Sequence, residues 1–306
     1  VHQFLSFVSQ GPEASLVESL ARQPIWDVIL QTRNPLHWLS VAGSQLFGVS
    51  PSFALLVLSN LFLLLFLWEA FQLFNRMVTT DISTLAAIFI LLWPTSYELS
   101  LGSSLPLVGF FFLMALRQAL EQVWWISGLA AAAVALIDPI ALAALPAFAY
   151  VFWSVQRFLT PKEWGRNLAF FLVPMAIGGL LSGGSYSIVL ESLGNSALLD
   201  LISLQTGGES LISHAYMGQT LALVFLFLGA TGALFSNVNP LHRFLPLLVL
   251  LAFLVCTPYN AMASRVPIAG ICMEGIASAS SGMASRVVSL LMVLLGAYEV
   301  YMLFGA

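Results

Sequence analysis

The sequence is short of charged residues and of cysteine. Only 8% of its 306 residues are Asp, Glu, Lys or Arg, against roughly 25% in an ordinary soluble domain. A soluble chain of this length needs more charged side chains to cover its surface, so a water-soluble fold is excluded. Cys256 and Cys272 are too few for a disulfide framework or a cysteine-based metal site. They are either two unpaired thiols or one disulfide.

Several motifs of enzymes and metalloproteins are also absent. The sequence contains no phosphate-binding glycine-rich loop with Lys, no HExxH and no GxSxG. Its four histidines lack the spacing of metal ligands, and we predict neither a metal nor a cofactor. The net charge of −4 is small and the basic residues are scattered, which argues against nucleic-acid binding.

What the sequence contains is a series of separate apolar runs. Hydrophobic residues make up 59% of the chain, and a helix needs on the order of 20 of them to cross a membrane. The runs lack the period-two alternation of a β-barrel. We therefore predict an all-α polytopic membrane protein with about nine or ten transmembrane helices. The predicted spans are 52–74, 84–97, 103–118, 124–137, 140–157, 167–185, 217–235, 244–258, 266–283 and 287–304.

The distribution of Lys and Arg predicts the orientation of the chain. We expect an outer-face amphipathic segment over residues 1–50 and a transmembrane bundle over 51–306, with an outer loop at 186–216. Basic residues concentrate in short cytoplasmic loops, and most are cytoplasmic if residues 1–50 are periplasmic or luminal. Those basic residues are Arg76, Arg117, Arg157, Lys162, Arg166, Arg243 and Arg286. The sequence opens without Met or a signal peptide, and we expect a further helix upstream.

Two residues of the N-terminal segment are candidates for chemistry. Asp27 follows Trp26, and a carboxylate at a membrane surface could act as a general base towards a lipid-linked substrate. We also predict that His37 contacts the substrate. The alternative is that Asp27 lies on the polar face of an interfacial helix, because apolar residues recur at roughly helical spacing. These residues are Leu16, Val17, Leu20, Ile25, Val28 and Ile29.

Ionisable residues within or beside the apolar runs are further candidates, because they are costly at membrane depth. Asp138 precedes Pro139 between two runs. It either contributes to substrate binding at the outer boundary or forms a helix-breaking Asp-Pro turn. Glu274 either pairs with a basic group across the bundle or faces a polar cavity. Glu69 lies near a helix end and is predicted to be solvated.

The region from Pro35 to about Tyr150 carries an ordered set of features. It includes the stretch NPLHWLSVAGSQLFGVSPSFALLVLSNL, which opens a predicted helix, and later LLWPTSYELSLGSSLPLVGFFF. In order and spacing, these features resemble the PIG-V-like mannosyltransferases, membrane glycosyltransferases of the GT-C class. The resemblance lies in the sequence of features and not in one diagnostic motif.

The resemblance implies a GT-C-like fold and a polyprenyl-phosphate-linked mannose as donor. By its place in the first outer loop, Asp27 matches the catalytic Asp of the class. Arg265 is the outer cation that would pair with the donor phosphate, the alternative being an interfacial anchor. The chain departs from the family at Gly102–Ser104, where the family has Tyr-Ser-Glu, and at Ile137–Pro139, where it has Thr-Arg-Pro.

These departures leave three interpretations. The first is an active GT-C-type transferase, with membrane lipids and the sugar donor as partners. The second is a non-catalytic homologue on the same fold, which would be a structural subunit of a larger membrane protein complex. The third, a transporter or channel, is weaker because the sequence lacks a convincing inverted repeat.

Overall fold

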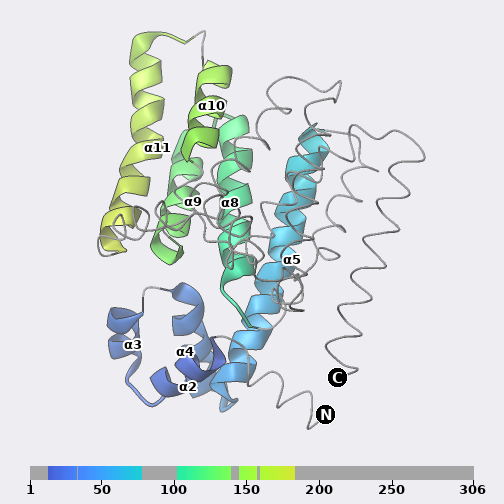
Figure 1. Cartoon of the computed structure of the whole chain (residues 1–306), viewed down its shortest axis with the longest axis vertical. Helices are drawn as coiled ribbons and strands as arrows, with labels where there is room; N and C mark the ends of the chain where they lie inside the picture. Colours follow the sequence, from blue (N-terminus) through green and yellow to red (C-terminus); the bar gives the residue numbers. More distant parts are fainter. Residues whose placement is uncertain (1–12, 33, 78–101, 139–144, 157–158, 183–306) are drawn as a thin grey trace, which may run out of the picture.

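The structure is a computed structural model (Figure 1) and describes residues 13–32, 34–77, 102–138, 145–156 and 159–182. Every regular element within these ranges is an α-helix, which agrees with the predicted all-α class. The helices are α2 (Ala14–Leu20), α3 (Ile25–Gln31), α4 (Pro35–Phe47), α5 (Pro51–Met77), α8 (Leu105–Leu120), α9 (Trp124–Ile137), α10 (Leu145–Gln156) and α11 (Pro161–Leu181).

The three short helices α2, α3 and α4 gather at one end of the bundle, which we call the N-terminal face (Figure 1). Helix α4 begins at Pro35 because the Asn34 side chain caps it, accepting a hydrogen bond of 3.0 Å from the Leu36 N–H. It ends at Phe47, and the C-cap residue that follows is Gly48, whose φ of 66° is left-handed. The predicted amphipathic segment thus contains three helices. Part of its apolar side faces protein, through the buried residues Val17, Leu20, Val28, Leu36 and Val41.

Helix α5 is the longest described helix and spans about 40 Å. Helix α8 runs in the same direction, because Gly102 lies against Leu55 near the N-terminal face while Arg117 contacts Glu69 further along both helices. Helix α9 then returns to the N-terminal face, where Ile137 packs. We call the opposite end of the bundle, where α5 and α8 end and α9 begins, the distal end.

An aromatic core joins α8, α9, α10 and α11. The ring centroids of Phe112 and Phe148 are 5.8 Å apart, and those of Trp124 and Phe152 are 4.7 Å apart. Phe171 of α11 lies 5.2 Å from Phe148. The first two pairs meet edge to face, an arrangement that contributes beyond the area it buries. Side chains far apart in sequence therefore fix the four helices together.

Two glycines let α9 and α11 approach closely. A Cβ at Gly128 would lie 2.3 Å from the carbonyl oxygen of Phe170, and one at Gly178 would lie 2.4 Å from that of Ala132. Small residues at such contacts are typical of helix pairs in membranes.

Two described helices are long and apolar enough to cross a membrane. They are Pro51–Leu73 of α5, with mean hydropathy 2.1, and Pro161–Leu181, with mean hydropathy 1.3. Only 17% of the apolar window of α11 is buried, so α11 is not the enclosed core helix of a soluble protein. Helices α8 and α9 are apolar but shorter. The predicted spans 84–97 and those from residue 217 onwards lie outside the described residues.

The predicted run at 167–185 differs from α11 in its bounds. The helix begins at Pro161, because Thr160 and Glu163 form a reciprocal capping box. The Thr160 hydroxyl donates to the Glu163 carboxylate at 2.7 Å. The first turns of α11 are polar and therefore lie outside the apolar run that predicted the helix.

Candidate functional site

Asp27 lies in the first turn of α3, on the N-terminal face, and its side chain is exposed. Trp26 beside it is 73% exposed, whereas Val28 is fully buried. The Asp27 carboxylate forms no hydrogen bond or ion pair with another described residue. It is therefore accessible to an external ligand, as general-base chemistry requires. The same position also suits the polar face of a surface helix.

One apolar cluster connects α3 with the end of α9. Ile25 and Val28 of α3 pack into it, and so does Ile137 of α9. Asp27 lies between the first two in sequence, and Asp138 directly follows the third. Both carboxylates therefore belong to the N-terminal face. The buried members of the cluster are Val17, Leu20, Val28, Leu36, Val41, Leu55 and Leu107.

Asp138 is half-buried and caps the C-terminus of α9, where its N–H donates to the Val134 carbonyl at 2.8 Å. The helix ends before Pro139, as the Asp-Pro sequence predicts. The end of α9 at Ile137 agrees with the helix-breaking interpretation of Asp138, and its role in substrate binding stays a prediction. Arg265, the predicted phosphate-binding cation, lies outside the described residues, as does Glu274.

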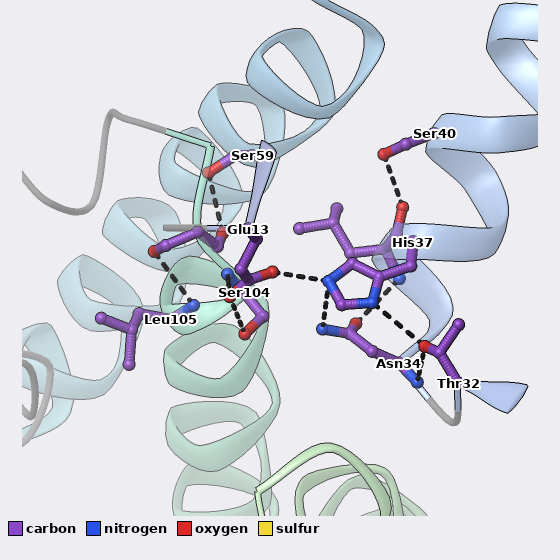
Figure 2. Close-up of polar contacts among 10 residues, drawn as sticks. Glu13, Thr32, Asn34, His37, Ser40, Ser59, Ser104 and Leu105 are labelled. Carbon is purple, nitrogen blue, oxygen red and sulfur yellow. Dashed lines mark hydrogen bonds and ion pairs between the residues drawn. The ribbon is translucent and has the colours of Figure 1, made fainter. Parts of the chain in front are cut away.

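A partly buried polar network joins the N-terminal segment to the start of α8 (Figure 2). The Glu13 carboxylate accepts a hydrogen bond of 2.7 Å from Nε2 of His37. Its other oxygen accepts from the Ser104 N–H at 2.9 Å and from the Ser104 hydroxyl at 2.8 Å. A single carboxylate thus binds both α4 and the turn that precedes α8.

His37 is only 5% exposed, and protein groups contact both of its ring nitrogens. Nε2 faces Glu13, and Nδ1 lies 3.0 Å from the Thr32 hydroxyl. The Asn34 amide is also 3.4 Å from Nε2. With the Nε2–H tautomer, the imidazole donates to Glu13 and accepts from Thr32. His37 therefore holds Glu13 in place, and a direct contact with substrate stays a prediction.

Burial and hydrogen bonding act in opposite directions on Glu13. Burial raises the pKa of its carboxyl, while the hydrogen bonds from His37 and Ser104 lower it. The hydrogen bonds prevail, and the pKa lies below its ordinary value. Glu13 is therefore an anion at neutral pH, with its charge directed at Ser104.

Glu13 lies beside one of the two places where the chain differs from the family that it resembles, the segment Gly102–Ser104. The resemblance expects a carboxylate at position 104, where the chain has Ser104. The structure brings the Glu13 carboxylate against that serine from 91 residues away in sequence. No sequence motif identifies Glu13 as a functional residue. The only feature of the sequence that could have indicated it is an acidic residue directly before a predicted helix.

A second ionic cluster lies towards the distal end and corrects the expectation for Glu69. Glu69 is 6% exposed, and it is not solvated. Arg117 donates to it through Nε at 2.7 Å and through Nη2 at 3.0 Å. Arg117 also donates to Glu121 at 2.8 Å, and Arg76 contacts the same Glu121 oxygen at 3.0 Å. The cluster fastens α5 to α8 and is remote from Asp27.

Comparison with protein-family models finds no match to the chain, and comparisons with curated proteins and with solved structures find none either. Within the described ranges, no group of three or more His, Cys, Asp or Glu side chains is arranged to bind a metal ion.

Proposed function

We propose that this chain is a GT-C-type membrane glycosyltransferase homologue that transfers a sugar from a polyprenyl phosphate at its N-terminal face. The observation that carries the proposal is the contact between Glu13 and Ser104. It supplies a carboxylate at the place where the resemblance to the PIG-V-like family expects one. Asp27, the proposed base, belongs to the same face.

The arrangement of charge supports the orientation that this function needs. Arg76, Arg117, Lys162 and Arg166 all belong to the distal end, since α5 and α8 end there and α11 begins there. Basic residues favour the cytoplasmic side. The N-terminal face would then be periplasmic or luminal, and the polytopic bundle would separate the two sides.

In the proposed reaction Asp27 acts as the general base. The oxygen of an acceptor hydroxyl bonds to the anomeric carbon of the sugar, and its proton passes to the Asp27 carboxylate. The bond between that carbon and the phosphate oxygen breaks, and polyprenyl phosphate leaves with the electron pair. A positioned base typically contributes about 10²- to 10⁴-fold to such a rate.

The proposal is tested with membranes that contain the overexpressed chain and radiolabelled polyprenyl-phosphate mannose, by following release of polyprenyl phosphate. We expect Asp27→Asn to lose release by about 10²-fold or more. Arg22→Gln, which removes an exposed charge from the same segment, serves as the matched control and should keep the wild-type rate. Equal rates for wild type and Asp27→Asn would rule out the assigned base.

A second function is favoured by Asp138. Its carboxylate stands where the resemblance expects an arginine, and an anion there would repel a donor phosphate. This favours a non-catalytic structural subunit of a larger membrane protein complex. Such a subunit would co-purify in fixed stoichiometry with other membrane proteins in mild detergent and would release no polyprenyl phosphate.

A further inference from the structure

Four exposed tryptophans lie towards the distal end of the bundle, and Trp26 is exposed on the N-terminal face. Trp68 of α5 adjoins Glu69 of the ionic cluster, and the other three distal ones lie in the last turn of α10 or the first turns of α9 and α11. Four different helices thus carry a tryptophan towards the end of the bundle where α5, α8 and α10 end and α9 and α11 begin (Figure 1). The exposed fractions are 59% for Trp68, 55% for Trp125, 63% for Trp153 and 42% for Trp164. Tryptophan is enriched where a membrane meets water.

Two cations accompany these rings on α11. Lys162 and Arg166 are four residues apart, so they share one side of the helix, and both are exposed. Trp164 lies between them in sequence, and its ring is 5.2 Å from that of Phe152, which precedes Trp153. Two residues along an α-helix turn the chain to its other side, so Trp164 lies at the level of the two cations but on the opposite side of α11.

Lys162 and Arg166 differ from the other distal cations in their pairing. Arg76 and Arg117 are ion-paired with Glu121, and Arg117 with Glu69 as well. Among the described residues, neither Lys162 nor Arg166 forms an ion pair. Glu163 lies near enough to interact with Arg166, but its carboxylate accepts hydrogen bonds from Thr160 in the capping box.

We propose that Lys162 and Arg166 bind the phosphate of an anionic phospholipid headgroup, with Trp153 and Trp164 at the level of the lipid carbonyls. The adjoining surface of α11 favours a lipid over a soluble anion, because apolar side chains continue along the helix from this site. They include Leu172, Val173, Ile177, Leu180 and Leu181, all exposed. A dissolved phosphate has no apolar part that could contact that surface.

The proposal rests on the membrane placement given above, and not on sugar transfer. Each basic residue near an anionic membrane surface contributes about fivefold to binding. Single Lys162→Gln and Arg166→Gln variants should therefore each lose about fivefold, and the double variant about 30-fold. Arg22→Gln removes a cation from the opposite end and should lose nothing.

The test is native mass spectrometry of the whole chain purified in detergent, titrated with phosphatidylglycerol, phosphatidylcholine or inorganic phosphate. We expect selective binding of phosphatidylglycerol by wild type and by Arg22→Gln, and the stated losses in the three other variants. Unchanged phosphatidylglycerol binding by the double variant, equal binding of the two lipids, or displacement of the lipid by inorganic phosphate would each overturn the proposal.

Two further measurements keep the outcomes separate. The circular dichroism spectrum of the double variant must match that of wild type. If it does not, the single variants, each lacking one charge, test the lipid site instead. Alkaline carbonate extraction tests membrane placement alone. If the chain remains in the membrane but does not select the anionic lipid, only the lipid site fails; if carbonate extracts the chain, the membrane placement fails.

Discussion

Nε2 of His37 donates a hydrogen bond of 2.7 Å to the Glu13 carboxylate, across 24 residues of sequence. The same carboxylate binds the turn before α8 through Ser104. This relationship fixes the N-terminal helices on the bundle, and with them the position of Asp27. The placement of the proposed base Asp27 therefore depends on Glu13.

Glu13→Gln should loosen the N-terminal face. The variant removes the charge that His37 and Ser104 hydrogen-bond, and leaving buried partners poorly satisfied costs about 1–3 kcal/mol. We expect faster amide hydrogen exchange in α2, α3 and α4 and a lower unfolding temperature in detergent. Asp27→Asn is the matched control, because it removes a carboxylate of the same segment that lacks a described partner. Equal exchange in the two variants would show that the network does not hold the segment.

The network should also make the stability of the fold depend on pH in the acidic range. The pKa of Glu13 in the folded protein lies below its ordinary value of 4.5. The stabilisation from its ionised form is therefore complete above pH 4.5 and is lost as the pH falls through the folded-state pKa. Unfolding midpoints measured at intervals from neutral pH to acid should fall more steeply for wild type than for Glu13→Gln. Parallel curves would contradict this assignment.

The contact between α9 and α11 predicts sharply different effects at glycines. Gly128→Ala and Gly178→Ala would each place a Cβ within 2.5 Å of a backbone oxygen, whereas a Cβ at Gly165 meets nothing within 4 Å. We expect the first two variants to lose about 1–3 kcal/mol or more through overpacking. Gly165→Ala should be neutral or stabilising by up to about 1 kcal/mol. Thermal unfolding in detergent distinguishes these outcomes, and equal midpoints would contradict the close approach.

The distal ionic cluster predicts a difference between buried and exposed charges. Glu69→Gln leaves Arg117 without its bidentate partner, and breaking a buried ion pair costs about 3–5 kcal/mol. Arg76, with its side chain 56% exposed, should cost less than about 1 kcal/mol when changed to Gln. A chemical-denaturation series in detergent compares the two variants. Similar small losses in both would mean that Glu69 is solvated, as its place in the sequence first indicated.

The sequence predicted features that depend on runs of neighbouring residues. The apolar runs at 52–74 and 124–137 correspond closely to α5 and α9, because hydrophobic length is a local property. The Asp-Pro pair likewise predicted the end of α9. The grouping of Arg76, Arg117, Lys162 and Arg166 at one end was also predicted, from the alternation of spans and loops.

Contacts between distant residues could not be predicted in this way. Glu69 was expected to be solvated because nothing nearby in sequence indicates Arg117, which is 48 residues away. Glu13 was missed because its two partners come from α4 and the start of α8. The start of α11 was misplaced because a capping box, and not hydrophobicity, sets it.

The central claim is that Asp27 is the base of a sugar transferase at the N-terminal face, and its most direct test is the ratio of donor turnover between wild type and Asp27→Asn. Both proteins are compared in membranes at matched expression, with Asp27→Glu as the variant that retains a carboxylate. If Asp27 is the base, turnover falls by about 10²-fold or more in Asp27→Asn and partly recovers in Asp27→Glu. Turnover that is absent in wild type, or equal in wild type and Asp27→Asn, would contradict it.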